Sequence, residues 1–321
     1  MLSFSEQFSE WVVAGIPFVF LIDFEQKKPL LYTFDEAARR DIYFDIKGVT
    51  NAPKRELSSK PTFTKTTPVS KKNYAKAFDY VKHHINRGDS FLLNLTFPSG
   101  VESQHSLLDF FYASRAPYKF YKKDDFVIYS PECFIKIEED TIYSYPMKGT
   151  IDAGLPEAEK QLTNNLKEQY EHNTIVDLLR NDLSQIAKNV RLNRFRYLEK
   201  IKGTHGELYQ SSSEIQGTLA HNWQKNSGEL IHKLLPAGSV SGAPKNKTLE
   251  LIRAAEGSER GYYTGVFGIY DGKRLESGVN IRYIEQRHGK YHYRSGGGIT
   301  HLSTLDEEYE ELIHKIYVPF I

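Results

Sequence analysis

The sequence predicts an α+β fold with large antiparallel β-sheets. Segments of strand length follow one another in runs joined by Gly-containing turns, whereas a doubly wound parallel sheet needs strands that alternate with helices. Long helical patterns occupy about 156–189, 243–256 and 304–317. Together the runs of strands and the separate helices favour one large domain.

Composition excludes several classes of protein. The 321 residues carry 42 Lys and Arg against 41 Asp and Glu, a net charge of +1, so no overall field would recruit nucleic acid or an anionic membrane. The longest apolar run, Trp11–Ile22, is too short to span a bilayer and has no basic leader. A single cysteine, Cys133, excludes an intrachain disulfide and is typical of a reducing, cytoplasmic setting.

The N-terminal region, residues 1–67, is expected to be a strand-rich part of the same fold as the main domain at 68–321. The aromatic and β-branched run at 11–22 predicts two buried strands bent at Gly15 and Pro17. Residues 48–67 are polar and rich in Pro, Lys, Ser and Thr, which is typical of a linker or a surface loop.

The next two elements have clear boundary signals. Ser70 is a typical N-cap for a helix whose apolar residues recur at helical spacing and that ends before Gly88. The segment 91–97 then predicts a strand that stops at Pro98. Further strands are predicted at 126–129, 134–138, 141–145, 266–270, 279–284 and 291–294.

Carboxylates extend the apolar face of the helix predicted at 156–189. At 100° per residue, Glu168, Glu171 and Asp182 fall on the same stripe as Ile175 and Leu178. Burying such carboxylates costs on the order of several kcal/mol unless cations or donors compensate, so we expect positive charge beside them. The alternative is that this turn leaves the core and faces water.

The last helix repeats the pattern, with Glu308, Glu311 and Lys315 beside its apolar residues. Taken alone, Glu311 and Lys315 would be an ordinary solvated i,i+4 pair. Two helices that each carry Glu-x-x-Glu would, however, suit a hard divalent ion such as Mg²⁺. Neither helix offers the His pairs or thiolates expected of zinc.

Three further positions could bind an anion. The segment 235–245 is a Gly/Ser loop that leads into a helix, and Gly296–Gly298 would let the backbone approach a ligand closely; a bare helix cap and a flexible turn are the alternatives. Neither loop has the spacing of a nucleotide-binding motif. Arg282, within the strand predicted at 279–284, could clamp a carboxylate or form a cross-strand ion pair.

Lys148 lies where a predicted strand breaks beside Pro146 and Gly149. Partial burial or neighbouring cations would lower the pKa of an amine there and make it nucleophilic, although most lysines at turns are simply solvated.

Taken together, these segments resemble the chorismate-utilising enzymes, which include anthranilate, aminodeoxychorismate, isochorismate and salicylate synthases. The resemblance covers about 70–318 and implies a sandwich core of antiparallel sheets covered by helices. The matching motifs are Gly88-Asp89-Ser90, Ser130-Pro131-Glu132, Pro146-Met147-Lys148-Gly149-Thr150, Glu171-His172, 175–183, 238–245, Arg260-Gly261-Tyr262-Tyr263, Ile281-Arg282, 296–299 and 308–315.

The lysine at 148 resembles aminodeoxychorismate synthase component I, because the other branches usually carry a small residue there. The resemblance implies that Lys148 attacks C2 of chorismate as the C4 hydroxyl leaves, with Glu132 as general acid or base. Ammonia then adds at C4 and expels the lysine, giving 4-amino-4-deoxychorismate, a precursor of p-aminobenzoate and folate. His205 is implied as a further catalytic residue, although the apolar residue that usually precedes it is absent.

The resemblance also assigns ligands. Glu171 and Glu311 would bind Mg²⁺, with Glu168 and Glu308 holding its waters. Chorismate would be held through its carboxylates by one set of residues and enclosed around its ring by another. The first set is Tyr263, Arg282, Gly296, Gly298 and Lys315, and the second is Gly149, Thr150 and Ser241.

The sequence has no Gly-x-Cys-x-Gly nucleophile for hydrolysing glutamine. We therefore expect a glutamine amidotransferase subunit to supply ammonia, as in the family that the chain resembles. Two alternatives stay open: an anthranilate synthase-like subunit that aromatises its product, and a non-catalytic chorismate-binding paralogue.

Overall fold

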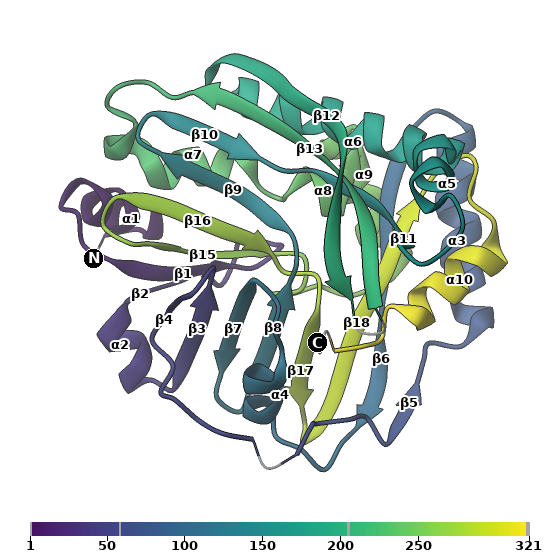
Figure 1. The fold of residues 1–321 in the computed structure, drawn as a ribbon, viewed down its shortest axis with the longest axis horizontal. Helices are drawn as coiled ribbons and strands as arrows, with labels where there is room; N and C mark the ends of the chain where they lie inside the picture. The colour runs from purple at the N-terminus through teal and green to yellow at the C-terminus, as the bar shows by residue number, and fades with distance from the viewer. Residues whose placement is uncertain (1, 58, 204–205, 319–321) are drawn as a thin grey trace.

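The strands of the protein form two large antiparallel sheets (Figure 1). The computed structural model describes residues 2–57, 59–203 and 206–318. Within these residues each sheet has nine strands, and every pairing between neighbours is antiparallel. The predicted α+β class is therefore confirmed.

The first sheet has β12 (Lys188–Gly203) beside β13 at one end and β2 at the other. Its remaining order is β11 (Met147–Asp152), β13 (Gly206–Thr218), β10 (Thr141–Ser144), β9 (Cys133–Glu138), β16 (Arg274–Val279), β15 (Val266–Tyr270), β1 (Phe18–Ile22) and β2 (Leu30–Thr33).

The second sheet has β5 (Lys65–Thr67) beside β6. Its remaining order is β14 (Gly242–Ala243), β6 (Leu92–Glu102), β18 (Lys290–Ile299), β17 (Tyr283–Arg287), β8 (Phe126–Ser130), β7 (Tyr118–Lys122), β3 (Ile42–Ile46) and β4 (Val49–Thr50). Residues before 68 thus contribute strands to both sheets.

Apolar side chains of the two sheets meet between them. Phe267 and Ile269 of the first sheet share one buried cluster with Phe44, Phe120 and Phe126 of the second. Burial of this shared surface holds the sheets together, because apolar area removed from water is the main favourable term in folding.

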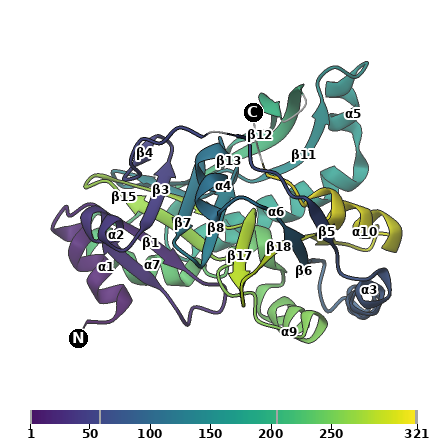
Figure 2. The same ribbon diagram turned by 90° about the horizontal axis from the view of Figure 1, so that it is seen from below.

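Helices cover the outer faces. Side chains of α1 (Phe4–Val13), α6 (Leu166–Ser184) and α7 (Ser227–Leu234) are buried against the first sheet. Those of α3 (Lys71–Asn86), α9 (Lys245–Glu256) and α10 (Leu305–His314) are buried with β6, and α4 (Leu107–Ala113) packs with β8. Figures 1 and 2 show α1 and α2 at one end of the molecule and α3 and α10 at the other. The shorter helices are α2 (Phe34–Arg39), α5 (Ala158–Asn164), α8 (Gly238–Ser241) and the 3₁₀ turn at Trp223–Asn226.

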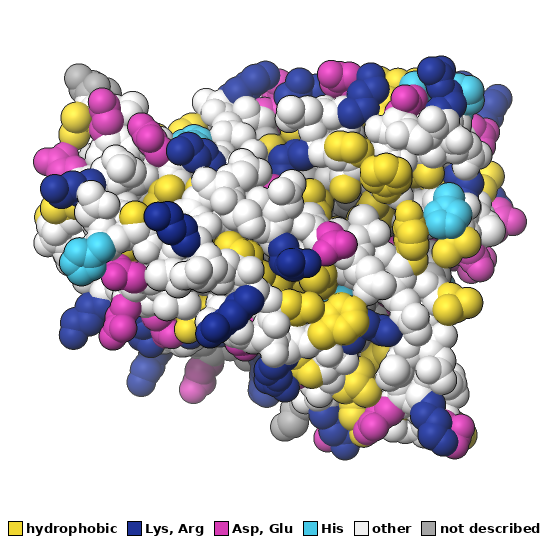
Figure 3. All heavy atoms as spheres, turned by 90° about the horizontal axis from the view of Figure 1, so that it is seen from above, with side chains coloured by type: hydrophobic (Ala, Val, Ile, Leu, Met, Phe, Trp, Pro, Cys, Tyr) yellow, Lys and Arg dark blue, Asp and Glu magenta, His cyan; other side chains and the backbone are white. Residues whose placement is uncertain are grey.

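The surface mixes charges of both signs. On the face shown in Figure 3, Lys and Arg side chains alternate with Asp and Glu side chains, and hydrophobic side chains lie between them. None of the described helices is both long and apolar enough to cross a membrane.

The predicted pair of strands at 11–22 is wrong in its first half. Trp11 and Val13 belong to α1, whose N-cap Ser3 forms a capping box with Glu6. Only Phe18–Ile22 is a strand. Trp11, Val12 and Val13 at the C-terminal end of this amphipathic helix gave the same apolar run as a strand would.

Of the helix predicted after Ser70 and the strand predicted at 91–97, the start of the helix is confirmed and the end of the strand is wrong. Helix α3 begins after its N-cap Ser70, as predicted. Strand β6, however, continues past Pro98 to Glu102. Pro98 lies opposite Arg294 of β18 and has no strand partner on its other side among the described residues, because β5 pairs only with 100–102. An unpaired edge tolerates proline, which lacks the N–H donor.

Three other boundaries also differ from the prediction. The helix predicted at 156–189 divides at Asn165 into α5 and α6, and β12 starts at Lys188. Gly296–Gly298 is not a turn, since β18 runs through it and pairs with β6. The strand predicted at 279–284 breaks after Val279, so Arg282 is not inside a strand.

Two of the short segments that carry the chain from one sheet to the other lie side by side. Pro131 and Glu132 connect β8 of the second sheet with β9 of the first, and 280–282 connect β16 with β17. The amide of Val279 donates to the carbonyl of Glu132 (3.0 Å), and the amide of Tyr129 donates to the carbonyl of Arg282 (2.9 Å). These crossings place Glu132 and Arg282 where the two sheets part.

A buried Arg-Glu-Arg cluster ties α9 to the second sheet. The carboxylate of Glu256 lies 2.6 Å from Arg260 and 2.9 Å from Arg294, and it accepts hydrogen bonds from the amide and hydroxyl of Thr96. Both arginines are almost completely buried. Glu256 therefore compensates two buried positive charges.

Replacing Glu256 by Gln is expected to lower the free energy of unfolding by about 3–5 kcal/mol, because two arginines would stay buried without a counter-charge. Urea denaturation followed by circular dichroism measures the loss. The control is Glu250→Gln, on the same helix, where an exposed pair with Lys247 is removed and the change should stay below about 1 kcal/mol. Equal unfolding midpoints for the two variants would contradict this account of the cluster.

Candidate active site

A β-bulge aims Lys148 out of the first sheet. The register of β11 against β13 shifts between Met147 and Thr150, so Lys148 and Gly149 together oppose one residue. Gly149 has φ +81°, in the left-handed region that favours glycine, which is typical of such a bulge. The Pro and Gly that flank the lysine in the sequence were the signal for this irregularity.

The acidic stripe of α6 is buried and has the expected cations. Glu171 and Asp182 are 7% and 4% exposed. The Nζ of Lys148 lies 3.2 Å from the Oε2 of Glu171, and the Nζ of Lys245 lies 2.8 Å from the Oδ2 of Asp182. The alternative, that this turn faces water, is wrong.

The pKa of Lys148 differs from the sequence-based expectation. Burial alone would lower it, but the charges of Glu171, Glu311, Glu132 and Glu168 outweigh burial and raise the pKa to about 12. These carboxylates therefore favour the ammonium form of Lys148. The sequence could not indicate this, because the four carboxylates come from three separate segments of the chain: α6, α10 and the connection between β8 and β9.

The acidic face of α10 approaches the glycine run of β18. Glu308 is completely buried. A Cβ atom at Gly297 would lie 3.0 Å from the Oε1 of Glu311 and 3.1 Å from the Oε2 of Glu308. Only a residue without a side chain lets both carboxylates come this close to the strand.

The next glycine meets the other helix. A Cβ atom at Gly298 would lie 3.5 Å from the Oε2 of Glu171 and 3.7 Å from the Nζ of Lys148. Carboxylates of α6 and α10 thus converge on two consecutive glycines. Glu168 lies beside the bulge, since its Oε2 would be 3.2 Å from a Cβ at Gly149.

Glu132 belongs to the same group of charges. Burial raises its pKa, while a hydrogen bond from Ser239 and the charges of Lys148, Arg282 and Lys315 oppose that increase. The shift keeps its carboxyl protonated at a higher pH than an ordinary glutamate. Ser239 lies within the motif at 238–245 but was not assigned a role from the sequence.

Two predicted carboxylate-binding cations line a cavity of about 440 Å³ near this group. Lys315 donates to the carbonyl of Gly296 (2.9 Å) and to Glu311 (2.6 Å). Arg282 lies on the sheet crossing, and Thr150 lines the same cavity.

The other predicted substrate ligands lie close to these elements. Tyr263 is buried, and its pKa is raised by burial against the opposing charges of Arg260, Arg282 and Arg294. Ser241 is buried in α8, where its hydroxyl donates to the carbonyl of Ala237 (2.9 Å). Gly296 packs against Leu95 and Thr96 of β6.

One predicted residue is not placed, and two residues were missed. His205 lies outside the described residues. His172 follows Glu171 and is fully buried, with its Nε2 2.6 Å from the hydroxyl of Ser213. The Ser213 amide donates to the carbonyl of Pro146 (2.9 Å), which links α6 to the segment that carries Lys148. Nothing in the spacing of Ser213 could indicate this contact.

The donor set is suited to Mg²⁺, but two of its members are paired with lysine. Glu168, Glu171, Glu308 and Glu311 supply only carboxylate oxygens, which this ion prefers. Within the described ranges, no group of three or more His, Cys, Asp or Glu side chains is arranged to hold a metal ion. Binding an ion between α6 and α10 would require the amine of Lys148 to move from Glu171.

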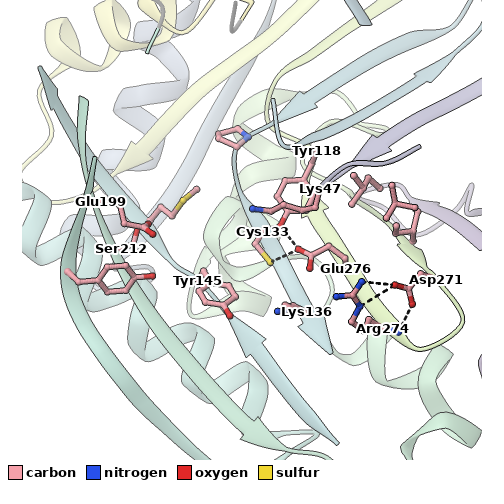
Figure 4. A pocket seen from close by; sticks show the side chains of 16 residues that line it. Lys47, Tyr118, Cys133, Lys136, Tyr145, Glu199, Ser212, Asp271, Arg274 and Glu276 are labelled. Carbon is pink, nitrogen blue, oxygen red and sulfur yellow. Dashed lines mark hydrogen bonds and ion pairs between the residues drawn. The ribbon is translucent and has the colours of Figure 1, made fainter. Parts of the chain in front are cut away.

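A second cavity, of about 460 Å³, is lined by residues of both sheets, with Pro131 and Met147 among them (Figure 4). The Tyr118 hydroxyl donates to Glu276 (2.5 Å), and Arg274 pairs with Asp271. No residue predicted for the site lines this cavity.

Comparisons with known proteins agree with these observations. Residues 18–320 match the family described as chorismate binding enzyme. An uncharacterized PabA-like protein of Pasteurella multocida is 50% identical over 318 residues, which are 99% of this chain and 98% of that protein. Aminodeoxychorismate synthase component 1 of Bacillus subtilis is 29% identical, over 82% of this chain and 58% of its own length.

A solved structure supports the fold. The menaquinone-specific isochorismate synthase MenF of Escherichia coli superposes with a TM-score of 0.76 over 97% of this chain and 79% of its own, at 16% identity. The match over residues 18–320 shows that the chain belongs to the chorismate binding enzyme family.

Proposed function

We propose that this protein is the synthase component of an aminodeoxychorismate synthase. It would convert chorismate and ammonia to 4-amino-4-deoxychorismate through an adduct on Lys148. The observation that carries the proposal is the position of the Lys148 amine, 3.2 Å from Glu171 and beside the backbone of Gly298, among the carboxylates of two helices. A small residue at 148 would have no amine to form the adduct.

The lysine must lose a proton before it can attack. Its pKa of about 12 reflects four surrounding carboxylates, so the free amine requires a base or a change in that charge. The neutral amine then bonds to C2 of chorismate, the double bond shifts, and the C4 hydroxyl leaves.

Glu132 is suited to protonate the departing hydroxyl. Because burial raises its pKa, its carboxyl holds a proton at a higher pH than an exposed glutamate. Ser239 and the nearby cations limit that increase. Ammonia then bonds to C4, the double bond shifts back, and Lys148 is released.

Glu171 and Glu311 would hold Mg²⁺ directly, and Glu168 and Glu308 would hold its waters. When bound, the ion supplies a Lewis acid and a fixed point for the ring carboxylate of chorismate. The Nζ of Lys148 lies 3.2 Å from Glu171, so the lysine and the ion would share this carboxylate as a source of negative charge.

Two cations are available for the carboxylates of chorismate. Lys315 and Arg282 line one cavity with Thr150, at the rim of the acidic group. Charge-assisted hydrogen bonds from a guanidinium and an ammonium fit a dicarboxylate substrate. Ammonia would come from a separate glutamine amidotransferase subunit, and free ammonium should replace that subunit in vitro.

Product identity is the first test. Incubation of the purified protein with chorismate, Mg²⁺ and ammonium is expected to give 4-amino-4-deoxychorismate, identified by mass spectrometry, because nothing in the proposed steps removes the pyruvyl group. Anthranilate as the product would favour the anthranilate synthase alternative. No conversion of bound chorismate would favour the non-catalytic paralogue.

Lys148→Ala and Lys148→Arg are expected to lower kcat roughly a thousandfold or more, because neither variant has a primary amine at this position. Calorimetry should show that both still bind chorismate. Lys290→Ala, an exposed lysine on β18, is the control and should have unchanged kcat. Wild-type turnover by Lys148→Ala would refute the nucleophile.

Removal of divalent ions with EDTA is expected to abolish turnover, and Mg²⁺ should restore it. Glu311→Gln should require a higher Mg²⁺ concentration for half-maximal activity by roughly tenfold or more, since it loses a carboxylate ligand. Asp306→Asn, in the first turn of the same helix and paired with Lys71, is the matched control. Equal Mg²⁺ dependence of the two variants would contradict the proposed ligand.

A further inference from the structure

The segment after α10 packs on Arg282. The guanidinium carbon of Arg282 lies 5.1 Å from the centroid of the Tyr317 ring, and its NH2 group donates to the Tyr317 hydroxyl (3.4 Å). The ring therefore covers one face of the guanidinium. Nothing in the sequence pattern around Tyr317 had assigned it a role.

Arg282, which is partly exposed, differs from the buried Arg260 and Arg294 in the groups that compensate its charge. Arg260 and Arg294 both pair with Glu256. Arg282 makes no ion pair with a carboxylate in the described part of the chain, and its other hydrogen bond, to the carbonyl of Ile281, is long at 3.3 Å. Its donors are thus available to an anionic ligand in the cavity that it lines.

Tyr317 is itself held in place. The Tyr293 hydroxyl of β18 donates to the carbonyl of Tyr317 (2.8 Å), and the next residue, Val318, is buried. Two residues earlier, Lys315 is bound to the carbonyl of Gly296 (2.9 Å). The segment 315–318 therefore connects the glycine run with the tyrosine that covers Arg282.

We infer that Tyr317 is a positioning residue that fixes the guanidinium of Arg282 for a carboxylate of the substrate. A flexible arginine must be ordered when it binds a ligand, and that ordering lowers affinity. Stacking on an aromatic ring orders the guanidinium beforehand, and its planar shape suits both the ring and a carboxylate. This inference rests on the proposed function, because it takes chorismate as the carboxylate ligand.

Substitution of Tyr317 should change the affinity for chorismate and not the rate of the chemical step, because Tyr317 contacts Arg282 and not Lys148. Tyr317→Leu keeps bulk but removes the ring, and Tyr317→Phe keeps the ring but removes the hydroxyl. We expect Tyr317→Leu to raise the KM for chorismate roughly tenfold with kcat within about twofold of wild type, and Tyr317→Phe to stay within about twofold for both.

The dissociation constant of chorismate, measured by calorimetry in the Lys148→Ala background, should rise by the same factor for Tyr317→Leu. Since Tyr317 is 41% exposed, both variants are expected to fold, and thermal melting checks this. Tyr80→Leu is the control: Tyr80, on α3, is similarly exposed at 38% and packs on His84, and its KM should be unchanged.

The outcomes separate this inference from the proposed function. If the Lys148→Ala protein binds chorismate but Tyr317→Leu leaves the affinity and the KM unchanged, the positioning role is wrong while the proposed function stands. The same conclusion holds if Tyr317→Leu lowers kcat alone. If the wild-type protein neither binds nor converts chorismate, both are wrong.

Discussion

The close approach of two acidic helices to Gly297 and Gly298 of β18 is the constraint on which the site depends. Carboxylate oxygens of Glu308 and Glu311 would lie within about 3 Å of a Cβ atom at the first glycine. At the second glycine, Gly298, a Cβ atom would lie 3.5 Å from Glu171 and 3.7 Å from Lys148. A side chain at Gly297 would crowd the two carboxylates of α10, and one at Gly298 would crowd Leu92 of β6, so both glycines keep room for the acidic group beside the strand.

The second requirement is a balance of charge. Glu132, Glu168, Glu171 and Glu311 all act on Lys148, so the amine is held as a cation. This arrangement stabilises the buried carboxylates but leaves the lysine unreactive. As proposed, a divalent ion at the same carboxylates would still compensate their charge, but its positive charge would lower the pKa of the nearby amine and favour the neutral form.

Much of the site could be predicted from the sequence where the signal was local. The stripe of α6, the N-cap Ser70 and the irregular strand at Lys148 are set by residues a few positions apart. The crossing at 280–282 was missed because it is only three residues long and has neither glycine nor proline, so the sequence reads as one strand from Val279 to Ile284. The pKa of Lys148 depends on carboxylates from distant segments of the chain. The spacing of residues along the sequence does not show which segments come together.

The most direct test of the account is a crystal structure with Mn²⁺ in place of Mg²⁺, together with a non-reactive chorismate analogue, and a measurement of the anomalous signal. The account predicts one peak between Glu171 and Glu311 beside Gly297, with the Lys148 amine turned toward the analogue. A structure that contains the analogue but shows no peak there, with Lys148 still paired to Glu171, would contradict it.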